Sequence, residues 1–269
     1  MKTTPPLSSE IKGEGHPLLI LHGFTGDHST MSSISEPLSK NYSVISVDLP
    51  GHGNTIRDPE SHLFNFEDTL KALIEVMEFY DQEEFNVLGY SMGGRLALGL
   101  AVYYPNKIKN TILLGATAGI ADENQRIARR RSDDRLAEEI LEKGIEWFVQ
   151  YWMEQPIFES QIRIDPEILD ASKKQRLQNN AQGLAGSLRG SGTGSQPSFW
   201  RKLSEINSPT LILVGEEDPK FRSLAVRLNS GISKSEIVVV PESGHACHLE
   251  NPDFTLEMIE TFLEEVLSR

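Results

Sequence analysis

Short apolar segments alternate with helical patterns along most of this 269-residue chain, and no other feature constrains its fold as strongly. Six segments have the length and apolar content of buried strands, and they are residues 17–21, 42–49, 85–88, 108–114, 210–214 and 236–240. Apolar residues at helical spacing mark the intervening and closing segments, most clearly over residues 66–80 and 254–267. Strands that alternate with helices predict an α/β protein with a mostly parallel sheet and helices on both faces.

The alternation stops between residues 121 and 200, where no segment has the character of a buried strand. Three charged helical patterns and a stretch rich in glycine and serine fill this region, over residues 122–142, 145–153, 166–179 and 183–195. We expect residues 1–120 and 201–269 to form the core. Residues 121–200 should form a helical lid at the carboxyl ends of the strands, where open α/β sheets bind ligands. The first dozen residues are polar and rich in proline, and we expect them to be weakly ordered.

The composition of the chain limits which kinds of partner it can bind and in which cellular compartment it is expected. The formal net charge of −13 disfavours nucleic acid or an anionic membrane as the main partner, because phosphate binding needs clustered cations. No apolar run reaches the roughly 18 residues needed to span a bilayer, and the first residues lack the apolar core of a secretion signal. Cys247 is the single cysteine, which excludes an internal disulfide and a cysteine-rich zinc site. We therefore expect a cytoplasmic protein without a metal centre.

Residues 89–93, Gly-Tyr-Ser-Met-Gly, match the pattern G-x-S-x-G between an apolar strand and a helix. This is the context of a nucleophile elbow, in which the serine occupies a strained turn and its neighbours must be small. Gly89 and Gly93 supply that room. The N–H groups at the start of the following helix favour negative charge near Ser91. A glycine-rich turn with an idle serine is the alternative, and the flanking segments argue against it.

A serine hydroxyl becomes a nucleophile or base when a histidine activates it and an acid orients that histidine. In this architecture the expected chain order is serine, acid, histidine. Asp218 follows the fifth strand and is the candidate acid, with Glu216 and Glu217 as alternatives that we expect to be solvated. His245 follows the sixth strand and is the candidate base, with His248 as the alternative.

The loop after the first strand is a candidate oxyanion-binding segment. Gly23 lets this loop approach the elbow, so the backbone N–H of Phe24 is expected to pair with that of Met92. A plain turn explains the glycine equally well. The same simple interpretation is preferred for the glycine-rich loop of residues 51–53.

Cations gather in the lid of an otherwise acidic chain. The segment 125–131 carries four arginines, and Arg95, Arg176 and Lys220 lie near other predicted site elements. Arginine binds carboxylates bidentately, so several cations at one pocket would suit a polyanionic small molecule. A solvated, salt-bridged helix face is the alternative for any one of them. Trp152 and Phe158 are candidates for an apolar wall or for lid core.

Taken together, these motifs resemble the α/β-hydrolase superfamily across nearly the whole chain. The motifs are residues 21–26 (Leu-His-Gly-Phe-Thr-Gly), 48–53 (Asp-Leu-Pro-Gly-His-Gly), 89–95 and 244–245. Four further segments look like the MenH family, the 2-succinyl-6-hydroxy-2,4-cyclohexadiene-1-carboxylate (SHCHC) synthases of menaquinone biosynthesis. These segments are residues 125–133, Trp152, 155–158 and 218–221.

The MenH resemblance implies a lyase that needs no cofactor and acts on a cyclohexene tricarboxylate, expelling pyruvate to leave a cyclohexadiene. It places the triad on Ser91, Asp218 and His245 and the oxyanion donors on Phe24 and Met92. The substrate-binding positions that it implies are Arg95, Arg129, Arg176, Tyr90, Trp152 and Lys220. One departure is the N-terminal segment, which lacks the pattern of the paired outer strands usual in the superfamily.

Two other functions fit parts of the pattern. A serine hydrolase acting on esters or carbon–carbon bonds would use the same triad, although a hydrolase of neutral esters has no use for several pocket arginines. A ligand receptor that kept the fold would be expected to lack a triad member, and all three candidates are present in this sequence.

Overall fold

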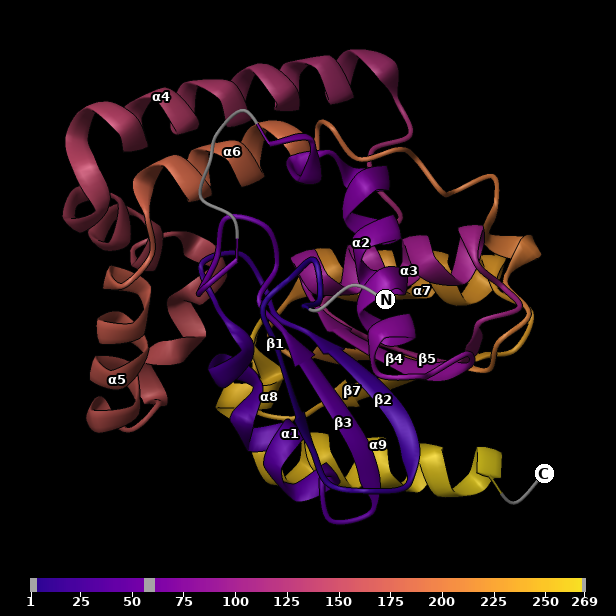
Figure 1. The fold of residues 1–269 in the computed structure, drawn as a ribbon. Helices are drawn as coiled ribbons and strands as arrows, with labels where there is room; N and C mark the ends of the chain where they lie inside the picture. Colours follow the sequence, from indigo (N-terminus) through magenta and orange to yellow (C-terminus); the bar gives the residue numbers. More distant parts are fainter. Residues whose placement is uncertain (1–3, 56–60, 268–269) are drawn as a thin grey trace.

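The computed structural model describes residues 4–55 and 61–267, which form a seven-stranded sheet with helices on both faces (Figure 1). The strand order is β1-β3-β2-β4-β5-β6-β7. Neighbours from β3 to β7 pair in parallel, and β1 joins β3 antiparallel. The strands are β1 (Ser9–Lys12), β2 (His16–Leu21), β3 (Tyr42–Val47), β4 (Phe85–Tyr90), β5 (Ile108–Leu114), β6 (Thr210–Gly215) and β7 (Ser235–Val240). The predicted fold class is confirmed, and the six predicted strands match β2 to β7 within a few residues.

Two apolar cores flank the sheet, because alternate residues of each buried strand point to opposite faces. On one face, α1 (Ser32–Leu38) and α9 (Pro252–Leu267) cover the sheet. On the other face lie α2 (Phe66–Phe79), α3 (Met92–Tyr103) and α7 (Pro219–Gly231), as Figure 1 shows. Shorter helices occupy the connections, namely η1 (His28–Met31), η2 (His62–Phe64), η4 (Leu203–Glu205) and α8 (Cys247–Glu250).

The N-terminal segment was predicted wrongly. Instead of a weakly ordered lead-in, residues 9–12 form β1 at the edge of the sheet, paired from Ser9–Val47 to Lys12–Val44. Three of its four residues are exposed, so the segment carries no apolar alternation that sequence could reveal. Backbone hydrogen bonding to β3 orders it, and the buried side chain of Leu7 fixes the residues just before it.

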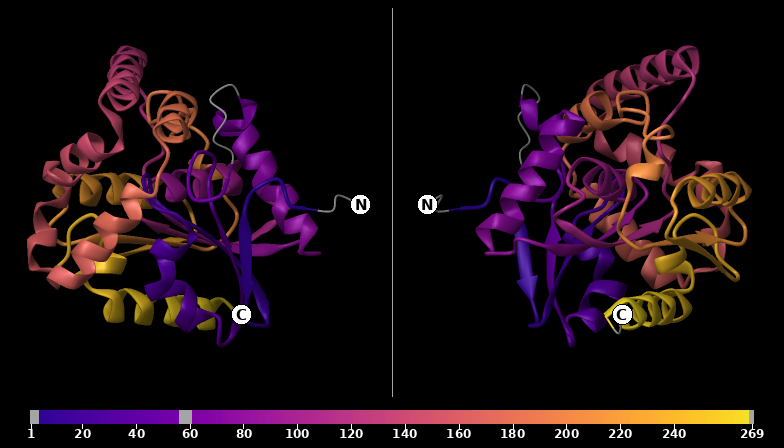
Figure 2. Two further views of the ribbon diagram at one scale, coloured as in Figure 1. Left: turned by 60° about the vertical axis from the view of Figure 1, so that its left-hand side comes forward. Right: turned by 90° about the vertical axis from the view of Figure 1, so that its right-hand side faces the viewer.

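Helices at the carboxyl ends of the strands form a separate layer, in which α4 packs along α6 (Figures 1 and 2). The layer comprises α4 (Glu123–Met153), η3 (Pro156–Arg163), α5 (Pro166–Leu177) and α6 (Ala181–Ser191). The two patterns predicted over residues 122–153 form α4, broken at Gly144 with φ 85° and ψ 175°. Within the described ranges, no helix is long and apolar enough to cross a membrane.

The helix α6 was not predicted, because most of it lies in the stretch rich in glycine and serine. Its small residues allow the helix to lie directly against the core, because a Cβ on Gly183 would come within 2.4 Å of the Gly51 carbonyl oxygen. A Cβ on Gly190 would come within 2.2 Å of the Phe64 carbonyl oxygen. Close packing against the core therefore outweighs the low helix propensity of glycine.

Candidate active site

Ser91 occupies the sharp turn between β4 and α3. Its backbone has φ 50° and ψ −102°, a conformation that L-residues rarely adopt and that is typical of functional positions. A Cβ on Gly89 would come within 2.2 Å of the Gly93 carbonyl oxygen, and one on Gly93 within 2.2 Å of the Leu21 carbonyl oxygen. Both glycines are therefore required for the turn to close, and the turn projects the serine side chain from the sheet edge.

The structure brings Ser91, His245 and Asp218 into one hydrogen-bonded chain. His245 Nε2 lies 2.9 Å from Ser91 Oγ, and His245 Nδ1 lies 2.9 Å from Asp218 Oδ2. Because the carboxylate is acceptor-only when ionised, Nδ1–H donates to it and Nε2 is left to accept from the serine hydroxyl. His245 and Asp218 are 4% and 8% exposed, respectively. The second carboxylate oxygen of Asp218 accepts the N–H of Phe221 and caps α7, so both oxygens hold the acid in place.

The alternative acids and base lie elsewhere. Glu216 and Glu217 are exposed. Glu216 accepts the N–H of Glu242, and Glu217 pairs with Arg163. His248 is buried on α8, with its ring centroid 4.3 Å from that of Tyr90. Burial and the neighbouring positive groups lower its pKa to about 3, so it is neutral at ordinary pH.

The loop after β2 presents Phe24 to the same cavity as Ser91 and Met92. Among the described residues, no hydrogen-bond acceptor takes the backbone N–H of Phe24 or of Met92. His22 Nδ1 lies 2.7 Å from the Gly23 carbonyl oxygen, which belongs to the same peptide unit as the Phe24 N–H. The bond from His22 thus fixes the loop that carries the Phe24 N–H. This N–H and that of Met92 are free to bind a ligand oxygen.

His52 also holds this loop, although the segment 51–53 was interpreted from sequence as a plain turn. Its Nε2 accepts the N–H of Thr25 at 3.2 Å, and burial lowers its pKa to about 3. The neutral ring is needed because a protonated Nε2 cannot accept a hydrogen bond. Sequence reasoning missed this role of His52. It becomes visible only when the tertiary structure brings residues 51–53 alongside the loop after β2.

A cavity of about 520 Å³ opens above Ser91 between the sheet edge and the lid helices. All six substrate-binding positions implied by the resemblance line it, and so do Ser91, His245 and the two predicted oxyanion donors, Phe24 and Met92. Those six are Tyr90, Arg95, Arg129, Trp152, Arg176 and Lys220. Trp152 packs against Phe24 and Phe158, with ring centroids 5.3 and 5.9 Å apart, so the apolar wall joins lid to core.

Four of the described arginines line this cavity, and they have different partners. The Arg227 guanidinium lies over the Trp200 ring, 4.0 Å from its centroid. Arg95 is 8% exposed and donates to the Ser191 carbonyl oxygen at 2.7 Å. Burial lowers its pKa to about 10, so it stays charged. Arg129 pairs with Asp133 at 2.7 Å, whereas Arg176 donates to the Thr25 hydroxyl. Among the described residues, Arg95 and Arg176 have no carboxylate within salt-bridge distance, and their charge is available to an anionic ligand.

The other arginines of the segment 125–131 do not line this cavity. Arg126 pairs with Glu123 on the same helix, and Arg130 donates to the Gly194 carbonyl oxygen. The sequence cluster therefore divides, with Arg129 facing the cavity and Arg126 and Arg130 serving the lid's own structure.

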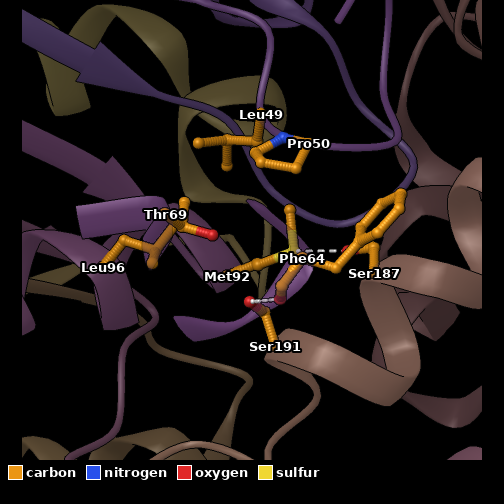
Figure 3. A pocket seen from close by; sticks show the side chains of 8 residues that line it. All are labelled: Leu49, Pro50, Phe64, Thr69, Met92, Leu96, Ser187 and Ser191. Carbon is orange, nitrogen blue, oxygen red and sulfur yellow. Dashed lines mark hydrogen bonds between the residues drawn. The ribbon is translucent and has the colours of Figure 1, made fainter. Parts of the chain in front are cut away.

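Lid and core also meet beneath the cavity, in the small pocket of Figure 3. There the Ser187 hydroxyl donates to Met92 Sδ at 3.6 Å, and the Ser191 hydroxyl donates to the Phe64 carbonyl oxygen at 2.7 Å. The first bond attaches α6 to Met92, the residue that follows Ser91, and the second attaches it to Phe64. In the described ranges, no group of three or more His, Cys, Asp or Glu side chains is arranged to hold a metal ion.

Comparison with known proteins places this site in a family. Residues 16–252 match the model of the alpha/beta hydrolase fold family. The chain is 36% identical over 93% of its length to a Bacillus subtilis (strain 168) protein that is provisionally named an SHCHC synthase, and covers 90% of that protein. It is 31% identical over 87% of its length to the SHCHC synthase of Enterobacter sp. (strain 638), covering 86% of it. The chain belongs to the MenH family of α/β hydrolases.

A solved structure of MenH from S. aureus agrees with this assignment. It superposes with a TM-score of 0.92 at 36% identity, over 96% of this chain and 98% of that one. The MenH-family fold thus extends over both the sheet and the helical layer that closes the cavity.

Proposed function

We propose that the protein is an SHCHC synthase of menaquinone biosynthesis. It converts 2-succinyl-5-enolpyruvyl-6-hydroxy-3-cyclohexene-1-carboxylate to SHCHC with release of pyruvate. The observation that carries the proposal is the Ser91–His245–Asp218 chain, which opens into a cavity lined by four of the described arginines, Arg95, Arg129 and Arg176 among them. Full-length similarity to MenH proteins supports the same reaction.

In the proposed reaction, Ser91 removes the proton alpha to the succinyl carbonyl and passes its own hydroxyl proton to His245. Asp218 stabilises the imidazolium and fixes its orientation. The electron pair moves onto the succinyl carbonyl oxygen, where the N–H groups of Phe24 and Met92 stabilise the enolate. The enolate then collapses, the ring carbon–oxygen bond breaks, and the expelled enolate of pyruvate takes the proton of the His245 imidazolium to become pyruvate. The developing charge is met by N–H dipoles and by the triad, so the mechanism requires no cofactor.

The substrate is a small molecule with three carboxylates, and these would explain why several cationic side chains line the cavity. Arg95, Arg129 and Arg176 are proposed to bind these carboxylates, with Tyr90, Trp152 and Lys220 completing the pocket. We propose that residues 121–200 act as the lid over the core of residues 1–120 and 201–269. The net charge of −13 disfavours nucleic acid or an anionic membrane as a partner. We also propose a cytoplasmic location.

The test is a pyruvate-release assay on the purified protein, with the cyclohexene tricarboxylate and a chromogenic ester measured side by side. We expect turnover of the tricarboxylate with stoichiometric pyruvate and little turnover of the ester. Rapid burst-phase ester hydrolysis with an inert tricarboxylate would instead establish the alternative, a serine hydrolase using the same triad.

A further inference from the structure

A second cavity, of about 240 Å³, is lined in part by Gly23, Phe24 and Gly26 of the loop after β2. Its walls come from η1 and α1 of the core, α5 of the lid and α8. Three residues line both cavities, namely Phe24, Tyr90 and Arg176. Only these side chains are shared, so the second cavity adjoins the site of chemistry without containing Ser91 or His245.

Arg176 supplies positive charge to this second cavity. Its neutral partners are the hydroxyls of Thr25 and, at 3.4 Å, Ser172. No carboxylate among the described residues lies within salt-bridge distance of it. The nearby carboxylate of Asp27 accepts instead from the side chains of Ser29 and Gln175. An anion in the cavity would therefore neutralise a guanidinium that the protein leaves without a counter-ion.

His248 supplies a second, independent sign of a ligand. It lines the same cavity, is 4% exposed, and its Nδ1 is buried with no hydrogen-bond partner in the described part of the chain. A buried polar atom without a partner destabilises the fold, so such an atom marks a place where another molecule can complete the bonding. The ring is neutral, and it can donate to or accept from an uncharged oxygen.

We propose that this second cavity binds a small 2-oxo acid, with its carboxylate on Arg176 and its oxo group near His248, and that pyruvate passes through it on leaving the active site. This inference rests on the proposed function, because that reaction expels pyruvate. The volume of about 240 Å³ is ample for a three-carbon acid. The product and pyruvate would then part on opposite sides of Phe24 and Tyr90.

The test measures binding of ¹³C-labelled pyruvate by NMR, alone and with saturating SHCHC. We expect pyruvate to bind equally well in both conditions, because SHCHC has lost one of the substrate's three carboxylates and leaves Arg176 to pyruvate. Ala171→Phe places a ring in the second cavity, and should weaken pyruvate binding about tenfold or more. Lys173→Phe, two residues along the same helix but outside the cavity lining, is the matched control and should bind pyruvate as the wild type does. Methyl pyruvate, which lacks the charge, should not bind.

Displacement of pyruvate by SHCHC, or unchanged binding in Ala171→Phe, would overturn the proposal. His248→Phe keeps the ring and removes both nitrogens, so it gives a second test if Ala171→Phe unfolds, and unchanged pyruvate affinity there would also overturn it. Turnover of the cyclohexene substrate, assayed separately, tests the proposed function itself, so a failure of the second cavity is distinguishable from a failure of the reaction.

Discussion

The sheet edge and the helical lid meet at one cavity, yet they are held in different ways. At the sheet edge, His245 and Asp218 are buried, and each has a direct side-chain partner. In the lid, α5 has no buried residue. Its Gln175 and Arg176, and Asn179 just beyond its end, make polar bonds to Asp27 and Thr25 in the loop after β2. Buried, doubly bonded groups stay in place, whereas a helix held by a few polar bonds can adjust.

This difference separates two tasks. Proton transfer needs its groups within a fraction of an ångström of their working positions, and the sheet edge provides that. Recognition of a polyanion needs charge that can follow the ligand, and we propose that α5 provides it with Arg176. Changes at the sheet edge should therefore affect kcat, whereas changes in the lid should affect KM.

The largest effect is expected for Ser91→Ala. Removal of the hydroxyl leaves no group to take the proton, so pyruvate release should fall about 10³-fold or more. The turn and its glycines remain, so the melting temperature should stay close to that of the wild type. Near wild-type turnover in a folded Ser91→Ala protein would remove this serine from the mechanism.

Asp218→Asn tests whether the acid acts through charge or only through structure. Asparagine keeps the oxygen that caps α7, so the stability change should be small, below about 1 kcal/mol. The loss of the negative charge and of the correct His245 tautomer should lower kcat by about 10²–10⁴-fold. Steady-state kinetics with a urea unfolding curve would separate the two effects. A parallel loss of stability and activity would contradict a role in catalysis.

A lid substitution should behave differently. Arg129→Met removes one charge-assisted hydrogen bond to a substrate carboxylate, worth about 1.5–3 kcal/mol, so KM should rise about 10–150-fold with little change in kcat. Arg130→Met, on the same helix but outside the cavity lining, is the control and should leave KM unchanged. If kcat fell and KM did not, the proposed division of labour between lid and core would be wrong.

The pH dependence of stability gives the smallest effect. The pKa values of His52 and His248 are lowered by burial from the ordinary 6.5 to about 3. Each therefore binds a proton more readily in the unfolded chain, so the free energy of unfolding should fall as the pH drops below 6.5. Each histidine should contribute about 1.4 kcal/mol per pH unit between these two values. Urea unfolding at pH 6.5 and 5.5 should show a shallower decline in His248→Phe, whereas an unchanged slope would show that this histidine is protonated in the folded protein.

Sequence predicted the chemistry of this site better than its surroundings. Ser91, Asp218 and His245 could be singled out because each follows a recognisable buried strand, and the carboxyl ends of parallel strands share one edge. β1 and α6 could not, since an exposed edge strand has no apolar pattern and a glycine-rich helix owes its stability to close packing against Phe64 and Gly51. The second cavity left no trace in the sequence either.

The sequence alone determined the strand–helix alternation, the elbow at Ser91 and the chain order of serine, acid and histidine, because each depends on residue type and local spacing. Only the tertiary structure decided which lid arginine faces the cavity, how His22 and His52 hold the oxyanion loop, and that Arg176 lies between two cavities. Those features arise where segments distant in the chain come into contact, and no local pattern of residues specifies such contacts.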